Sequence, residues 1–153
     1  MPYLLIFSPL LGSILGYFAK PLGDRYSEII TTSLVVISAT LSCIIFYNGA
    51  VHDMYGNYKI LDWINSGNFK VNWSINIDPL SSIMLVVVTS VSSLVHVYSI
   101  GYMSHDPNKP RFMSYLSLFT FSMLMLVVSD NFLQLFFGWE GVGLCSYLLI
   151  GFW

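Results

Sequence analysis

The stretch FLQLFFGWEGVGLCSYLLIGFW, residues 132–153, has the length and the apolar composition of a helix that crosses a membrane. Its single charged side chain, Glu140, lies near the middle of the stretch. An aspartate, lysine or arginine at the centre of such a helix costs roughly 2.5–3.5 kcal/mol on insertion scales, and a glutamate is expected to be similar. The stretch therefore predicts a membrane fold and, inside it, a carboxylate with a specific role.

The whole chain of 153 residues has the composition of a membrane protein. It is 56% hydrophobic and 9% charged, with a mean hydropathy of +0.71, whereas soluble domains carry about 25% charged residues. The net charge of −2 argues against the basic surface that nucleic-acid binding requires. Cys43 and Cys145 lie in different apolar segments without metal-ligand spacing, so we interpret them as packing residues.

Five apolar segments are long enough to span a hydrocarbon core of about 30 Å. Approximately, they cover residues 3–19, 29–47, 80–100, 112–128 and 131–153. We therefore expect an all-α membrane protein with about five transmembrane helices, the first of them a retained span and not a cleaved signal peptide. The connections 20–28 and 101–112 hold four of the six basic residues, and the positive-inside bias places them on the inner side of the membrane.

The longer connection between the second and third spans carries the pattern of β-strands. FKVNWSINID, residues 69–78, alternates apolar and polar residues as a half-buried strand does. It follows the turn-forming sequence NSGN at residues 65–68 and another short apolar stretch. We expect an external β-hairpin within residues 55–78. Because an isolated hairpin is marginally stable in water, its apolar side should rest on protein at the membrane surface.

Small residues recur at helical spacing around Glu140. They form a stripe where another helix can approach closely, and its members are Gln134, Gly138, Gly141 and Cys145. Glu140 points about a third of a turn away from this stripe, on the face of Gly143 and Tyr147. We expect Glu140 to face protein or a hydrated cavity and to change protonation when a neighbouring cation moves. The alternative is a structural hydrogen bond to a helix backbone or to a tyrosine.

A second candidate is His96, within the segment 80–100. Hydroxyl side chains precede it on roughly the same helix face, namely Ser82, Thr89 and Ser93. Histidine titrates near neutral pH, so this stripe predicts a possible proton relay. Interhelical hydrogen bonding, worth about 0.6 kcal/mol per contact, is the alternative. The sequence shows no phosphate-binding glycine loop and no metal-ligand spacing.

Three stretches resemble a known family: DPLSSIM at 78–84, SSLVHVYSIGYM at 92–103 and GWEGVGLCSYLLIGFW at 138–153. They are similar to the large antiporter-like membrane subunit of respiratory complex I, NADH:quinone oxidoreductase, which is called subunit 5 in mitochondria and subunit L in bacteria. The resemblance implies proton translocation coupled to quinone reduction elsewhere in the complex. It also implies a multi-pass protein of an energy-transducing inner membrane, bacterial or mitochondrial.

In that family, the acid that matches Glu140 is the key carboxylate of the fifth span and pairs with a lysine on a later helix. None of the predicted spans of this chain contains a lysine or arginine. The resemblance therefore implies an N-terminal piece of a longer subunit that does not pump protons alone. The implied partners are other complex I membrane subunits and the lipid bilayer. NADH, FMN, iron–sulfur clusters and quinone would bind other subunits, with no cofactor in this chain.

Two other functions are compatible with the same residues. Subunits of cation/proton antiporters share the fold and would use an intramembrane carboxylate in a related way. An inert fragment, or one that acts only in assembly, would keep the membrane composition without the proton chemistry.

Overall fold

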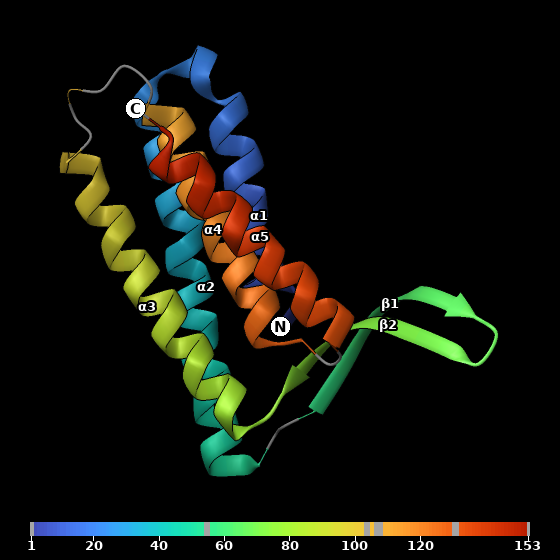
Figure 1. Ribbon diagram of the computed structural model, residues 1–153. Helices are drawn as coiled ribbons and strands as arrows, with labels where there is room; N and C mark the ends of the chain where they lie inside the picture. Colours follow the sequence, from blue (N-terminus) through green and yellow to red (C-terminus); the bar gives the residue numbers. More distant parts are fainter. Residues whose placement is uncertain (1, 54–55, 103–104, 106–108, 130–131, 153) are drawn as a thin grey trace.

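The computed structural model describes residues 2–53, 56–102, 105, 109–129 and 132–152. Five helices form an elongated bundle, and two strands form an arm that projects near one end of it (Figure 1). In chain order the elements are α1 (Pro2–Phe18), the short 3-10 helix η1 (Lys20–Leu22), α2 (Asp24–His52), β1 (Gly56–Ser66), β2 (Phe69–Ile77), α3 (Pro79–Tyr102), α4 (Lys109–Val127) and α5 (Phe132–Ile150).

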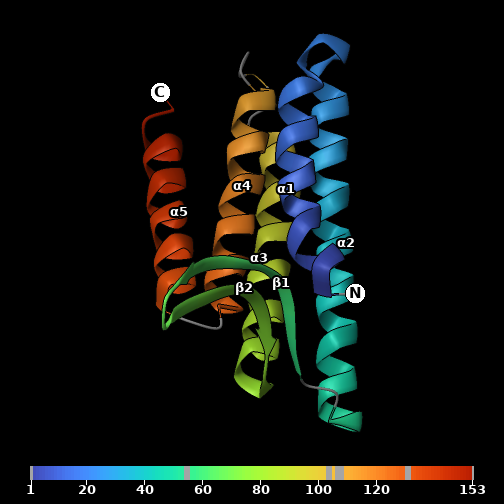
Figure 2. The same cartoon turned by 90° about the vertical axis from the view of Figure 1, so that its right-hand side faces the viewer.

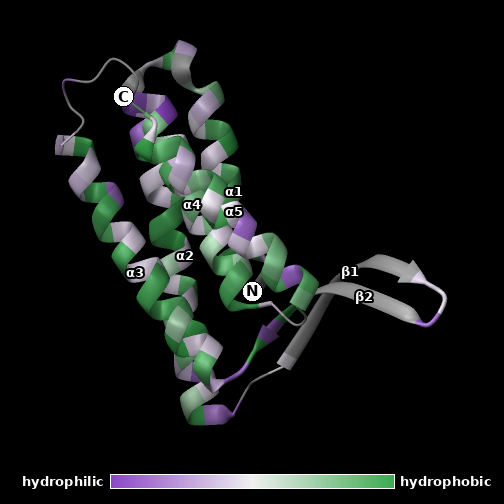
Figure 3. Ribbon diagram, viewed as in Figure 1, coloured by the Kyte–Doolittle hydropathy of each residue, from purple (hydrophilic) through white to green (hydrophobic). Residues whose placement is uncertain are grey.

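The helices have the size and polarity that a bilayer requires, which confirms the predicted fold class. In the described part of the chain, α2, α3, α4 and α5 are each long and apolar enough to cross a membrane. α1 is shorter, with 17 residues, and at about 1.5 Å per residue it still approaches the thickness of the hydrocarbon core. Much of the ribbon of the helices has the colour of hydrophobic residues (Figure 3).

The helix bounds differ from the predicted ones mainly in α2. The predicted span covered residues 29–47, whereas α2 runs from Asp24 to His52. The prediction counted only apolar residues, but the backbone remains helical through the polar flanks, where side chains can reach water. The predicted fifth span began at Asn131 and ended at Trp153, and both residues lie outside those that the structure describes.

A proline inside α1 determines how α1 joins α2. Pro9 has no N–H group, so the carbonyl of Leu5, one turn earlier, loses its normal partner within the helix. The hydroxyl of Ser38 on α2 donates a hydrogen bond to this carbonyl at 2.7 Å. Both Leu5 and Ser38 are fully buried, so the proline creates a polar contact between two apolar helices.

Hydroxyl groups make further hydrogen bonds between helices. Ser117 of α4 donates to the carbonyl of Pro9 at 2.7 Å, and Ser27 of α2 donates to the carbonyl of Gly16 at 2.8 Å. Ser42 of α2 and Thr89 of α3 share a hydrogen bond of 2.7 Å. Lipid tails are as apolar as the helices, so such contacts and close backbone packing hold helices together in a membrane.

The two strands form an antiparallel pair. Ser66 pairs with Phe69, which leaves Gly67 and Asn68 as the turn, and Gly67 has a φ of +59°, a conformation that glycine adopts readily. Near the helices, Ile75 and Ile77 of β2 are buried in the hydrophobic core. The rest of the pair projects from the bundle (Figure 1). The predicted range began at Tyr55, which lies outside the described residues.

β2 leads directly into α3. The side chain of Asp78 accepts a hydrogen bond of 2.7 Å from the backbone N–H of Ser81 and so caps the first turn of α3. Pro79 occupies the first position of the helix, where a missing N–H group leaves no bond unmade. The backbone N–H of Asn76 donates to the carbonyl of Val128 at 2.9 Å, which fixes the strand against the end of α4.

Replacing Ser38 with alanine should destabilise the bundle, because the buried carbonyl of Leu5 then loses its short hydrogen bond and keeps only the longer one, of 3.4 Å, from the Ser8 hydroxyl. An unsatisfied buried acceptor costs about 1–3 kcal/mol, and a loss at the lower end of this range should lower the midpoint of thermal unfolding of the purified protein in detergent. Thr40→Ala is the matched control, since its exposed hydroxyl bonds only to its own helix. Adding Pro9→Ala to Ser38→Ala should recover part of the loss by restoring the helical N–H group; a double variant no more stable than Ser38→Ala contradicts this account.

Candidate functional site

The predicted small stripe of α5 is the face that packs against α4. Gln134, Gly138 and Cys145 are buried. A Cβ atom added at Gly138 would lie 2.7 Å from the backbone nitrogen of Leu126, and one added at Gly141 would lie 2.8 Å from the hydroxyl oxygen of Ser122. The two helices therefore approach as closely as the glycines allow, and this contact sets the rotation of α5.

Gln134 attaches the beginning of α5 to the strand pair. Its side-chain amide donates to the carbonyl of Ser74 at 2.7 Å, and the backbone N–H of Ser74 donates to its side-chain oxygen at 3.2 Å. The amide thus bonds the backbone of β2 much as a neighbouring strand would. Gln134 is fully buried, so both hydrogen bonds are shielded from water.

Arg111, in the first turn of α4, holds the chain just beyond the other end of α5. Its guanidinium donates to the carbonyl of Phe152 at 3.2 Å and lies 4.7 Å from the centre of the Phe152 ring. A cation at a helix C-terminus is favourable, because the last carbonyls of a helix carry partial negative charge. α5 is therefore fixed at its beginning, along its buried face and just past its end.

Glu140 lies about a third of a turn away from the buried face of α5, and its side chain is exposed. As predicted, Gly143 and Tyr147 share this face, and both are exposed as well. None of the described elements covers the face, and the described residues give Glu140 no hydrogen-bond or ion-pair partner. The expectation that Glu140 faces protein or a cavity is therefore not met within this chain, because the rotation that buries the glycine stripe turns Glu140 outward.

His96 of α3, in contrast, is completely buried. Its Nδ1 atom lies 2.7 Å from the carbonyl oxygen of Ser92 and 3.4 Å from the Ser92 hydroxyl. The predicted hydroxyl stripe does face the interior: Ser82 and Thr89 are buried. Thr89 shares a hydrogen bond with Ser42 of α2. One residue of the stripe thus makes an interhelical hydrogen bond, which was the alternative to a proton relay.

An ion pair that sequence reasoning missed joins α2 and α4. The Nζ atom of Lys109 lies 3.5 Å from the Oε1 atom of Glu28, with side-chain exposures of 18% and 9%. Both residues lie at the ends of predicted connections, where charged residues are normally solvated. The only sequence signal was an acid and a base that flank the same end of two apolar helices.

Glu140 and His96 are not brought together. Figure 2 shows α4 between α5 and the other helices; Glu140 lies on the side of α5 that faces away from α4, and His96 lies in the bundle interior. Among the residues that the structure describes, no group of three or more histidine, cysteine or acidic side chains could hold a metal ion. The arrangement thus offers two separate titratable groups rather than one shared centre.

Comparisons with known proteins agree on one family. Residues 63–113 match the family model described as the N-terminus of chain 5 of NADH-ubiquinone oxidoreductase, complex I. The chain is 56% identical to NADH-quinone oxidoreductase subunit L of Rickettsia felis over 98% of its length, which is 23% of that relative. It is also 56% identical, over its whole length, to NADH-ubiquinone oxidoreductase chain 5 of Arabidopsis thaliana, again 23% of that relative.

Replacing Gly138 with alanine should destabilise the packing of α5 on α4. The new methyl group would lie within 2.8 Å of the backbone of Leu126, and overpacking of this kind costs typically about 1–3 kcal/mol. At Gly143 nothing lies within 4 Å of an added Cβ, so Gly143→Ala should be neutral or stabilising by about 0.5–1 kcal/mol through helix propensity. The measurement is the midpoint of thermal unfolding of each variant in detergent. Equal midpoints for Gly138→Ala and Gly143→Ala would show that the close approach of α5 to α4 does not contribute to stability.

Proposed function

Because this chain belongs to the family of complex I chain 5 and subunit L, as a homologue of the N-terminal part, we propose that it contributes to proton translocation coupled to quinone reduction. The chain spans about a quarter of the length of the curated relatives it matches. In this proposal it acts as part of a longer, multi-pass subunit of an energy-transducing inner membrane. NADH, FMN, the iron–sulfur clusters and quinone bind to other subunits, and other membrane subunits of the complex are its neighbours.

The observation that carries the proposal is the position of Glu140. A carboxylate in the middle of a 19-residue apolar helix is costly in contact with lipid. The same face of α5 exposes aromatic side chains, with Phe136 61% and Tyr147 73% exposed. Ionisable side chains within membrane spans almost always face other protein segments or a water-filled cavity, so the position of the acid favours a functional role.

The cation that would pair with Glu140 lies outside this chain in the proposal. The described basic side chains of α4, Lys109 and Arg111, are engaged at the end of the bundle with Glu28 and Phe152. The family resemblance implies a lysine on a later helix, within the part of the relatives that this chain does not match. When such a cation approaches, it stabilises the ionised acid; when it withdraws, the acid takes up a proton.

The relatives named above are all assigned to NADH-quinone or NADH-ubiquinone oxidoreductase, which favours this function over a cation/proton antiporter. Gly143 gives further support, because an added Cβ atom there would meet nothing within 4 Å. A covering helix could therefore approach the face of Glu140 closely.

Replacing Glu140 with glutamine in the complete enzyme should reduce the number of protons translocated per quinone reduced by roughly tenfold or more, because a positioned acid–base group contributes at least that much. Glutamine keeps the size and the hydrogen bonding of the side chain but cannot take up a proton. The measurement is formation of a pH gradient across proteoliposomes, per quinone reduced.

Asp53→Asn is the matched control for loss of one carboxylate. Asp53 is exposed at the end of α2 with a φ of +51°, a conformation that asparagine tolerates. This variant should assemble and translocate protons normally. An unchanged number of protons per electron in Glu140→Gln would rule out the assigned role of Glu140.

A further inference from the structure

Several buried polar atoms of the bundle have no hydrogen-bond partner among the described residues. Three of them belong to α2 and α3: Oε1 of Glu28, Oγ1 of Thr32 and Nε2 of His96. Glu28 Oε1 forms an ion pair with Lys109 at 3.5 Å but has no hydrogen-bond partner among the described residues. Buried polar groups in proteins are nearly always satisfied, by protein or by internal water, so these three atoms require an explanation.

The contacts between α2 and α3 place the three atoms in one region. Ser42 bonds to Thr89, and further along, Ser93 donates to the carbonyl of Val35 at 3.5 Å. The two helices are antiparallel. Thr32 precedes Val35 by three residues on α2, and His96 follows Ser93 by three residues on α3, so both lie on the same side of this contact. Thr32 and His96 therefore occupy neighbouring levels of the same interface.

α4 closes this region from the other side. On α3, Ser93 faces α2 and Ser92 faces Thr120 of α4. His96 follows them by about one helical turn, so its side chain points between α2 and α4. On α2, Glu28 lies one turn beyond Thr32 on the same face and meets Lys109 of α4. The polar atoms thus follow the junction of α2, α3 and α4 from its basic end, which carries Lys109, to His96.

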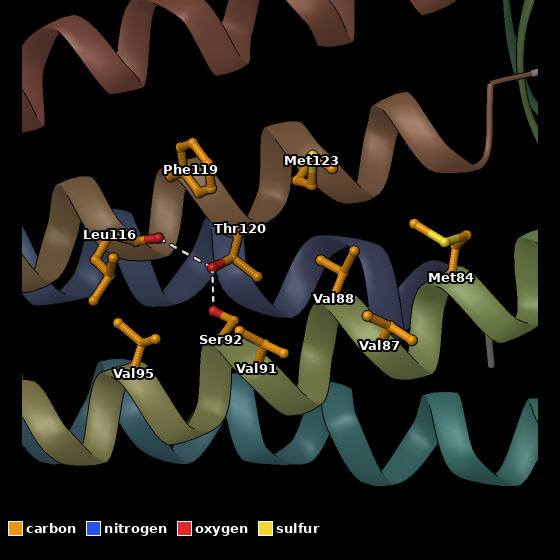
Figure 4. A pocket seen from close by; sticks show the side chains of 10 residues that line it. All are labelled: Met84, Val87, Val88, Val91, Ser92, Val95, Leu116, Phe119, Thr120 and Met123. Atoms are coloured by element: carbon orange, nitrogen blue, oxygen red, sulfur yellow. Dashed lines mark hydrogen bonds between the residues drawn. The ribbon is translucent and has the colours of Figure 1, made fainter.

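The hydrogen bonds of His96 determine which nitrogen can accept a proton. Its Nδ1 lies 2.7 Å from the carbonyl oxygen of Ser92, and a carbonyl only accepts, so Nδ1 carries the hydrogen. In the neutral ring Nε2 therefore has a free lone pair. The Ser92 hydroxyl also hydrogen-bonds to Thr120 of α4. These two are the polar residues that line a cleft of about 350 Å³ between α3 and α4, whose other lining side chains are apolar (Figure 4).

We propose that internal water occupies the junction of α2, α3 and α4 between the Glu28–Lys109 pair and His96, and that His96 is a second protonation site, supplied from the basic end of the bundle. A proton that arrives through this water adds to the lone pair of Nε2, gives the imidazolium form, and leaves from the same nitrogen. Thr32 positions the water. The inference rests on the proposed proton-translocating function but uses a route separate from Glu140.

Cysteine accessibility tests the hydration directly. In the complete enzyme with Cys43 and Cys145 replaced by alanine, Thr32→Cys should react with a small charged methanethiosulfonate reagent applied from the basic side. Val35→Cys is the control, because Val35 is fully buried on the same helix one turn away and apolar. Thr32→Cys should react at least about tenfold faster, since the reactive thiolate forms only where water reaches it. Equal rates for the two variants overturn the proposed hydration.

Proton translocation per quinone reduced tests the role of the two side chains. His96→Gln can keep the hydrogen bond to Ser92 but cannot be protonated, and Thr32→Val removes the unpartnered hydroxyl without changing its size. Both should lower translocation several-fold in assembled enzyme. Thr31→Val, whose hydroxyl bonds only to carbonyls of its own helix, should not. Normal translocation in His96→Gln overturns the proposal.

The outcome for Glu140→Gln in the same assay separates this inference from the proposed function. If Glu140→Gln blocks translocation and His96→Gln does not, the second site is wrong and the proposed function stands. If His96→Gln blocks translocation and Glu140→Gln does not, the role of Glu140 is wrong and the second site stands. Should a variant fail to assemble, the accessibility ratio of Thr32→Cys to Val35→Cys still decides for or against the hydrated junction.

Discussion

In the hydrocarbon core of a bilayer a polar group must find its partner inside the protein, because the lipid offers none. Most polar groups of this bundle obey that constraint through hydroxyls that bond to carbonyls, as Ser38 does with the carbonyl that Pro9 leaves unpaired. A few groups do not. Glu140 is exposed on α5, and Thr32 and His96 hold buried atoms without hydrogen bonds among the described residues. Because most other polar groups of the bundle have hydrogen-bond partners, these exceptions are the places where water, protons or other protein segments are expected.

The direction in which Glu140 points follows from how α5 is held. Gln134 bonds the backbone of β2 near its beginning, Gly138 lets it contact the backbone of α4, and Arg111 binds the carbonyl of Phe152 beyond its end. These contacts lie at three levels along the helix, so α5 cannot rotate without breaking several of them. The outward position of Glu140 is thus a property of the packed bundle and presents the acid to whatever covers that face.

Much of this arrangement could be predicted from local sequence patterns. The length of the apolar segments predicted the helices, and the spacing of Gly138 and Gly141 predicted the face of α5 that packs. The partners of single polar side chains could not be predicted, because they are distant in sequence: Gln134 meets Ser74 and Lys109 meets Glu28. A periodic pattern gives the direction of a side chain, but one sequence contains no signal for what lies opposite it. For the same reason, what faces Glu140 stays a prediction.

α4 relates the two titratable groups to each other. On one side its Thr120 bonds to Ser92, next to His96, and on the other its Ser122 contacts the glycine stripe of α5. Direct proton transfer requires groups within hydrogen-bond reach or joined by one water, and with α4 between them His96 and Glu140 do not meet this condition in the chain. In the proposed assignment, His96 and Glu140 therefore take up and release protons by separate routes, one on each side of α4.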